Sequence, residues 1–192
     1  MDDSAFKSQL AGLIPHMRAF ARNLCGDPVL ADDLAQDAML KAWEGRSAYR
    51  EGSNMKAWCF TILRNVFYSE KRRSWRVQAL EPGTAESVLV AADDPTVGLD
   101  LLTLRHALQC LPVDQREALI LVGAGAMTYE EAASICQCAV GTVKSRVNRA
   151  RRGLMDLLEG RVSPRPCERR MRAADAFEDL MSQVAELAGN HV

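Results

Sequence analysis

The sequence has no long apolar run. Its longest stretches without a charged residue are far shorter than the ~20 residues that a helix needs to cross a bilayer. The first ten residues, MDDSAFKSQL, are acidic and polar, which is not the pattern of a secretory signal. These two absences predict a cytoplasmic protein that does not engage a membrane.

The sequence also lacks the motifs of common active sites, including the P-loop, G-x-S-x-G, G-x-G-x-x-G and H-E-x-x-H. Its three histidines stand apart, and its six cysteines are scattered, which indicates reduced thiols and not a disulfide framework. Cys136 and Cys138 form a C-x-C pair, but no second pair or nearby histidine completes four zinc ligands. We therefore predict no catalytic residue, no metal site and no cofactor, so the chain is not an enzyme.

Charges of one sign are missing from whole segments, although the net charge is only −1. Residues 77–100 contain five acids and no Lys or Arg, and residues 27–44 contain five acids and one base. Residues 64–76 reverse this pattern with five bases and one acid, and residues 141–152 contain five bases and no acid. Such blocks indicate a surface that meets a polyanion on some faces and a basic partner on others. Solvated helix faces would give the same composition.

The apolar periodicity is helical, and an apolar content of 48% supports packed cores. Two prolines, two glycines and many small residues mark 77–98 as a flexible linker. We therefore predict an all-α fold with two small helical domains, 1–76 and 99–160. Residues 161–192 form a tail, in which an amphipathic helix is suggested by Met171, Ala174, Met181 and Val184.

Punctuating residues divide the N-terminal domain into helices. Pro15 splits a first apolar run, and Gly26 is placed to end it. Asp27 and Pro28 are typical of an N-cap and a first helical residue, and the helix that they begin extends to about Glu44.

The polar side of that second helix indicates a protein contact, because exposed Trp and Met lie beside acids. For Trp43, packing against another helix of the same bundle fits equally well. The candidate contact residues on this face are Asp32, Gln36, Met39 and Trp43.

A third helix, capped by Ser53 and Asn54, has two contrasting faces. One face is apolar and carries Met55, Trp58, Cys59, Ile62 and Val66. The other interleaves rings with bases and carries Phe60, Arg64, Phe67, Tyr68 and Lys71, followed by Arg72, Arg73 and Arg76. Rings stack on unpaired bases, at ~1–3 kcal/mol per base, while cations meet phosphates. The pattern predicts single-stranded nucleic acid binding, with a two-sided core as the alternative.

A capped helix, a tight turn and a basic helix predict a helix-turn-helix in the C-terminal domain. Thr128 and Glu131 have the spacing of a capping box. The turn at 137–140 leads into the basic helix. An apolar stripe with spacings of 4, 3, 4 and 3 holds this helix to its domain through Val143, Val147, Ala150, Leu154 and Leu157.

The opposite side of the basic helix offers groups that read DNA. Lys and Arg recognise guanine in the major groove, and Asn recognises adenine. The first backbone N–H groups of the helix suit a phosphate. A solvated basic helix is the alternative. The candidates are Gly141, Thr142, Lys144, Ser145, Asn148, Arg149, Arg151 and Arg152.

Three segments, in order, resemble ECF sigma factors, which are bacterial transcription initiation subunits. AVGTVKSRVNRAR after YEEAASIC resembles the DNA-reading half of their fourth domain. DPVLADDLAQDAMLKAW resembles the second-domain segment that grips RNA polymerase, and NMKAWCFTILRNVFYSEKRR resembles the segment that melts and reads the −10 element. LIPHMRAFARNLCG, SNMKAWCFTILRN and REALILVGAGAMTYEEAASIC look like the EcfG-type branch. The likeness covers about residues 6 to 158.

The resemblance implies a sigma-2-like bundle and a sigma-4-like helix-turn-helix joined by the linker. It implies core RNA polymerase, promoter DNA and a NepR-like anti-sigma factor, itself captured by PhyR, as partners of a chain that is monomeric when free. It implies a role in the general stress response. By similarity, the helix-turn-helix candidates read the −35 element. The residues that the resemblance implies meet the polymerase are Asp32, Asp33, Gln36 and Asp37, with Trp43 beside them. The −10 candidates are Tyr49, Asn54, Arg64, Asn65, Phe67, Tyr68, Lys71 and Arg72.

Two other functions stay open at this stage. A sigma-like mimic would bind an anti-sigma factor but no DNA. The basic helix is intact, and the chain is too short to hold a receiver domain of about 120 residues as well. An ordinary helix-turn-helix regulator is the other alternative, although the N-terminal domain shows no signature of a ligand pocket or of dimerisation.

Overall fold

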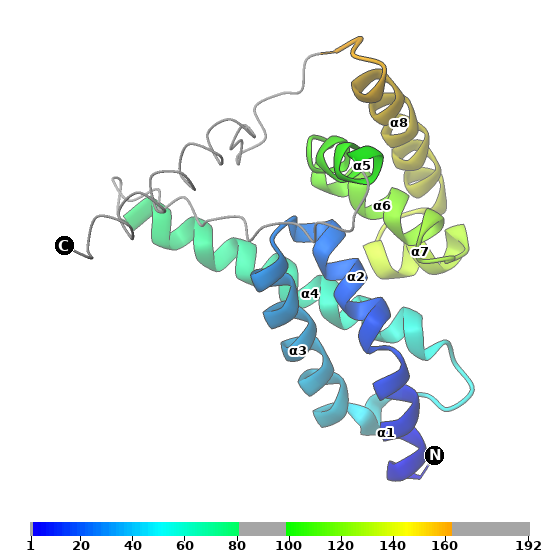
Figure 1. The fold of residues 1–192 in the computed structure, drawn as a ribbon. Helices are drawn as coiled ribbons and strands as arrows, with labels where there is room; N and C mark the ends of the chain where they lie inside the picture. The colour runs from blue at the N-terminus through cyan, green and yellow to red at the C-terminus, as the bar shows by residue number, and fades with distance from the viewer. Residues whose placement is uncertain (1, 81–98, 163–192) are drawn as a thin grey trace, which may run out of the picture.

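The computed structural model describes residues 2–80 and 99–162. All regular secondary structure in these two ranges is helical, as the sequence predicts (Figure 1). The N-terminal range holds α1 (Asp3–Gly12), α2 (Ile14–Cys25), α3 (Pro28–Glu44), the short 3-10 helix η1 (Arg46–Ala48) and α4 (Met55–Leu80). The C-terminal range holds α5 (Leu99–Gln109), α6 (Val113–Gly123), α7 (Tyr129–Cys136) and α8 (Val140–Leu158). The predicted tail helix and residues 81–98 of the predicted linker lie outside the described residues.

Local capping residues start and stop the N-terminal helices where the sequence predicts. Gly26 ends α2 with a φ of 80°, a left-handed conformation that glycine adopts at little cost. The Asp27 carboxylate then accepts hydrogen bonds from the backbone N–H groups of Val29 and Leu30 at 2.9 and 3.0 Å, which caps α3. Asn54 accepts a similar bond from Ala57 at 3.1 Å.

The core of the N-terminal bundle lies between α2, α3 and α4. Met17, Leu24 and Leu63 are fully buried there. The ring of Phe60 is buried too, and it stacks on Phe20 with centroids 4.6 Å apart. This pair ties the N-terminal part of α4 to α2, so α4 packs through a broader surface than the apolar face that the sequence predicts.

The last bundle helix is longer than the sequence predicts. We expect the N-terminal domain to end at residue 76, but α4 continues to Leu80. Residues 77–80 contain neither proline nor glycine, and the first residue that breaks a helix is Pro82. The helix therefore extends into the segment that composition alone assigns to a linker.

The C-terminal helices form the predicted helix-turn-helix. Thr128 and Glu131 make both bonds of a capping box at the start of α7. Val143, Val147 and Ala150 of α8 are fully buried against the rest of this unit. A Cβ at Gly125 would lie 2.5 Å from the carbonyl oxygen of Leu121, so only glycine fits the turn between α6 and α7.

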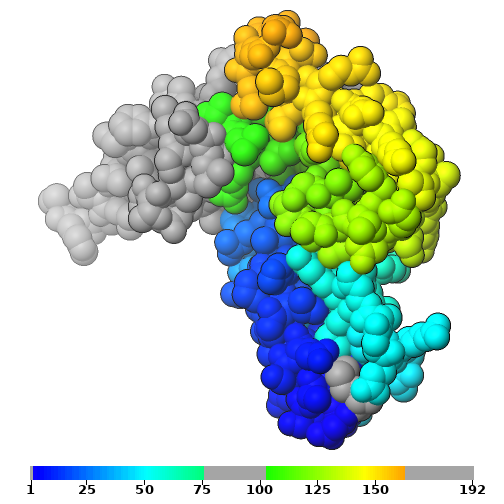
Figure 2. Space-filling view, turned by 90° about the vertical axis from the view of Figure 1, so that its right-hand side faces the viewer, coloured from blue at the N-terminus to red at the C-terminus, as the bar shows by residue number. Residues whose placement is uncertain are grey.

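The two groups of helices pack against each other. Helix α2 contacts α5 and α6, and α4 contacts α7. In Figure 2 the green and yellow C-terminal helices lie directly on the blue and cyan surface of the N-terminal bundle. Residues distant in the sequence therefore meet at this junction.

Candidate nucleic-acid interface

Helix α8 presents the predicted −35 residues outward. Lys144, Asn148 and Arg149 are exposed on the side opposite the buried stripe. Gly141, Arg151 and Arg152 are exposed as well, while Thr142 and Ser145 are half-buried. The structure thus gives α8 the shape of a recognition helix, with one face held in the domain and the other available to a major groove.

Contacts within α8 and with Tyr129 of α7 orient two of these side chains. The Ser145 hydroxyl donates to the Thr142 carbonyl at 2.9 Å, and the Arg149 guanidinium donates to the Ser145 hydroxyl at 3.0 Å. The Lys144 ammonium lies 5.6 Å from the centre of the Tyr129 ring. These contacts limit the rotamers of Lys144 and Arg149 before any ligand arrives, which reduces the entropy that binding costs.

Arg146, at the edge of the basic face, has a structural partner. Its guanidinium lies 3.1 Å from the Asp114 carboxylate of α6. This ion pair joins α8 to α6, so Arg146 differs from the exposed arginines of the same helix.

The predicted −10 residues on α4 are much less uniform. Asn65, Lys71 and Arg72 are exposed, whereas Arg64 and Tyr68 are half-buried. Phe67 is only 7% exposed. The expectation of an open aromatic face is therefore wrong for Phe60 and Phe67. Helix α4 buries these two rings as well as Cys59 and Val66 of its apolar face, so the alternative of a two-sided core holds at these positions.

The half-buried −10 candidates Arg64 and Tyr68 are hydrogen-bonded to a carboxylate from the C-terminal helices. Glu117 of α6 is 0% exposed, and its side chain faces α4. The Arg64 Nε–H donates to one carboxylate oxygen at 2.6 Å, and the Tyr68 hydroxyl donates to the other at 3.1 Å. The Arg64 guanidinium also lies over the Tyr68 ring, 4.6 Å from its centre.

Burial governs the proton affinities of this cluster. Burial raises the pKa of the Glu117 carboxyl, and the neighbouring Arg64 guanidinium opposes the rise. Burial also raises the pKa of the Tyr68 phenol, and the nearby Glu117 carboxylate raises it further. The Tyr68 hydroxyl therefore keeps its proton at neutral pH and remains a hydrogen-bond donor.

Two further polar contacts cross the junction between the domains. The Asn54 side-chain amide donates to the Glu131 carboxylate of α7 at 2.7 Å. The Gln109 amide of α5 donates to the Asn23 carbonyl of α2 at 3.0 Å. The Gln109 side chain lies so close to Gly26 that a Cβ there would come within 2.7 Å of it. The junction is therefore closely packed as well as polar.

An aromatic cluster fixes the loop before α4. The Tyr49 hydroxyl donates to the Ser53 carbonyl at 2.6 Å, and the Tyr49 ring lies 5.3 Å from that of Trp58. Trp43 packs against Phe6 with ring centres 6.2 Å apart, and the Arg46 guanidinium covers it at 4.5 Å. This packing within the bundle is one of the two explanations that the sequence allows for Trp43.

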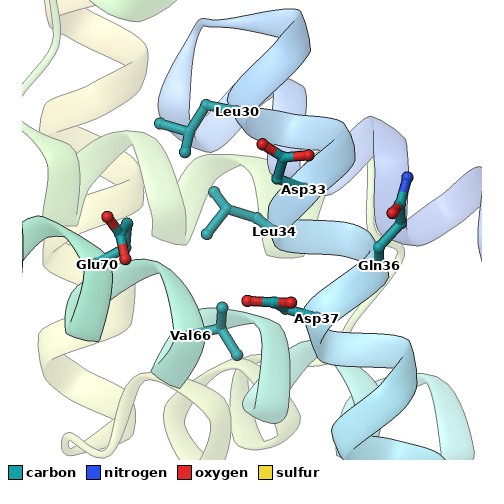
Figure 3. Close-up of a pocket in the computed structure, with 7 residues that line it drawn as sticks. All are labelled: Leu30, Asp33, Leu34, Gln36, Asp37, Val66 and Glu70. Atoms are coloured by element: carbon teal, nitrogen blue, oxygen red, sulfur yellow. The ribbon is translucent and has the colours of Figure 1, made fainter.

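The predicted polymerase-binding residues divide between two sides of α3. Asp33, Gln36 and Asp37 are exposed and border a groove of about 360 Å³ between α3 and α4, which Glu70 lines from α4 (Figure 3). Asp32 points to α2 instead, where it lies 3.2 Å from Arg18 and 3.7 Å from Arg22. The acidic groove, as we call this depression, has an apolar floor of Leu30, Leu34 and Val66.

The sequence patterns above do not identify three acidic residues in these roles. They are Glu117 at the junction, Glu70 in the acidic groove, and Glu131, which binds Asn54 in addition to capping α7. A signal for Glu117 exists, because it lies three and four residues before Ile120 and Leu121, on the stripe of α6 that is buried. An acid on a buried stripe requires a partner. Its partner Arg64 is 53 residues away, so the spacing could not have identified it.

The described residues lack two other kinds of feature, a cluster of metal ligands and a membrane-spanning helix. Nowhere in these ranges do three or more His, Cys, Asp or Glu side chains gather in a way that could hold a metal ion. Among the helices that the structure describes, none has the length and apolar character to span a membrane.

Comparisons with known proteins agree with this architecture. Residues 11–77 match the family model "Sigma-70 region 2", and residues 101–154 match "Sigma-70, region 4". The chain is 46% identical to the ECF RNA polymerase sigma factor EcfG of Rhodopseudomonas palustris, over 80% of this chain and 85% of that protein. It is 33% identical to the ECF sigma factor SigC of Mycobacterium tuberculosis, over 65% of this chain and 68% of that protein.

Solved structures give the same result. The sigma factor RpoE in its complex with the anti-sigma factor NepR from Bartonella quintana superposes with a TM-score of 0.74 and 45% identity, covering 81% of this chain and 97% of RpoE. CnrH in complex with the cytosolic domain of CnrY superposes with a TM-score of 0.62 and 25% identity, covering 83% of this chain and 90% of that one. These matches confirm the predicted all-α fold with sigma-2 and sigma-4 regions. The chain belongs to the ECF family of RNA polymerase sigma factors, which direct transcription initiation and are not enzymes.

Proposed function

We propose that this sigma factor serves a general stress response and that a NepR-like anti-sigma factor holds it inactive. The similarity to EcfG supports the first part, and the similarity to a sigma factor solved with NepR supports the second. It acts in the cytoplasm as the promoter-reading subunit of an RNA polymerase and is a monomer when free of partners.

The −35 element is read by α8. The support is the contrast between its two faces, with Val143 and Val147 fully buried and Asn148 and Arg149 exposed. Lys144, Asn148 and Arg149 reach base edges, and Arg151 and Arg152 hold phosphates. This contrast is the observation that carries the proposed DNA-binding function.

The −10 element is read by α4 and the loop before it. Asn65, Lys71 and Arg72 are exposed and can meet unpaired DNA as the chain stands. Arg64, Tyr68 and Asn54 can do so only after releasing the C-terminal acids that they now bind. Tyr49 holds the loop in shape through its bond to Ser53.

The acidic groove binds a basic surface of the polymerase. Asp33 and Asp37 lie one turn apart on α3, so both can meet one cationic helix. Glu70 adds a third acid to the same groove, and Leu40, which is 57% exposed, follows on α3. Asp32 is already paired with Arg18 and Arg22, so it contributes less to this contact than its two acidic neighbours.

Transcription in vitro with core RNA polymerase tests the proposal. A sigma factor gives promoter-dependent transcripts, and adding a NepR-like protein stops them. The double variant Asp33→Lys, Asp37→Lys should lose core binding and transcription together while staying folded, because exposed changes usually cost under ~0.5 kcal/mol. A sigma-like mimic would give no transcripts, and an ordinary regulator would only repress. Unchanged affinity of the double variant for core would contradict the role of the groove.

A further inference from the structure

We propose that Glu117 is the centre of an autoinhibitory latch, through which the C-terminal domain occupies part of the −10 surface before polymerase or an inhibitor binds. The latch consists of Glu117 with Arg64 and Tyr68, together with the pair of Glu131 and Asn54. This inference rests on the proposed −10 role of Arg64, Tyr68 and Asn54.

The chemistry of Glu117 favours a latch over a purely structural role in its own domain. Its carboxylate is completely buried, and it accepts hydrogen bonds from Arg64 and Tyr68, which both lie on α4 in the other domain. A buried carboxylate without partners is strongly destabilising, whereas water satisfies an exposed one. The contact between Glu117 and Arg64 therefore stabilises the arrangement in which the two domains are packed together. When the domains separate, this contact is lost and water solvates both charged groups instead.

The latch and DNA compete for the same atoms. The Arg64 guanidinium that would meet a phosphate donates to Glu117 at 2.6 Å. The same guanidinium covers one face of the Tyr68 ring, so that face is closed to a stacking base. The Asn54 amide donates to Glu131 at 2.7 Å. Carboxylates from α6 and α7 thus take the place of the DNA's anionic groups.

The two halves of the latch differ in strength. Arg64 is only 15% exposed, and a short, buried and charge-assisted bond to Glu117 is among the stronger polar contacts. Asn54 and Glu131 lie at the exposed edge, where solvent weakens the bond. Removal of Glu117 should therefore open the latch, and a change at the edge should have a small effect.

The test uses the full chain without polymerase and measures its affinity for a fluorescent single-stranded DNA 20-mer of random sequence. Glu117→Gln keeps the size of the side chain but removes the charge and one acceptor. We expect it to bind about tenfold more tightly than the wild type, because apparent affinity rises with the fraction of open molecules. The matched control is Asp114→Asn on the same helix, which breaks a pair with Arg146 inside the C-terminal domain. It should bind like the wild type.

Unchanged or weaker binding by a folded Glu117→Gln variant would overturn the latch. If circular dichroism shows that this variant is unfolded, Tyr68→Phe decides instead, because it removes one bond to Glu117 and keeps the ring. We expect it to bind a few-fold more tightly, and an unchanged affinity would overturn the latch as well.

A separate variant distinguishes failure of the latch from failure of the −10 assignment. Asn65 is exposed and lies outside the latch. In the holoenzyme, Asn65→Ala should slow promoter melting, measured by permanganate reactivity of promoter thymines. Slowed melting by Asn65→Ala, with no effect of Glu117→Gln in the free chain, would reject the latch alone. Unaffected melting would reject the −10 assignment on which the latch rests.

Discussion

Helices α8 and α4 both carry a basic, polar face proposed to bind DNA, but they present it differently. The face of α8 is exposed along Lys144, Asn148 and Arg149. On α4, Phe67 is buried and Arg64 is bound to Glu117 of the other domain. Helix α8 packs through a single stripe, so its whole polar face is free to bind a ligand. Helix α4 packs on two sides, so only part of its polar face is exposed.

The largest expected effect tests the second packed side of α4. Phe60 is 2% exposed and stacks on Phe20, so Phe60→Ala should lower the free energy of unfolding by about 3–5 kcal/mol. Chemical denaturation followed by circular dichroism measures this. The matched substitution Tyr129→Ala, at a half-buried ring of α7, should cost clearly less. A loss for Phe60→Ala as small as that for Tyr129→Ala would mean that the Phe60 ring is not packed as a second buried side of α4 requires.

The next effect tests the buried stripe of α8. Val147 is fully buried, so Val147→Asp places an unpaired charge in the core and should destabilise the C-terminal domain by at least about 3 kcal/mol. Asn148→Asp, one residue along on the exposed face, is the control and should stay folded. Thermal unfolding distinguishes them, and a folded Val147→Asp variant would refute the stripe.

Local rules predict much of this architecture from the sequence. Gly26, Asp27 and the capping box of Thr128 and Glu131 all satisfy backbone groups within a few residues, so short patterns reveal them. The stripe of α8 is also visible, because Val143, Val147 and Ala150 repeat at helical spacing within one element.

The remaining features depend on partners far away in the chain. Phe60 is buried because Phe20, 40 positions earlier, covers it, and spacing within α4 cannot show that. Glu117 engages Arg64 across 53 positions, and this contact exists only when the two domains meet. Asp32 turns to α2 for the same kind of reason, since Arg18 lies on the preceding helix.

A smaller effect sharpens the proposed roles within α8. Arg149 is exposed and oriented by Ser145, so Arg149→Ala should cost about 1–3 kcal/mol of holoenzyme binding and relax discrimination at one −35 position. Binding of the holoenzyme to a library of −35 variants measures this. If all sequences lose affinity equally, Arg149 holds a phosphate and α8 is docked in another register.

The smallest effects compare phosphate contacts on the two helices. Arg151→Ala on α8 should weaken all sequences alike and lower the salt slope of binding by roughly 0.9 for one duplex phosphate. Arg72→Ala on α4 should lower it by roughly 0.7, because the contact is with a single strand. Titrations at several salt concentrations give both slopes. An unchanged slope for either variant would remove that residue from the interface.

The central claim is that α8 and α4 contact two different promoter elements in the initiation complex. Photo-crosslinking from the exposed positions Asn148 and Asn65, each replaced by a benzophenone amino acid, tests it most directly in the holoenzyme bound to a promoter. We predict crosslinks from position 148 to the −35 duplex and from position 65 to the non-template strand of the −10 element. Crosslinks from both positions to one element, or none from position 148, would contradict the account.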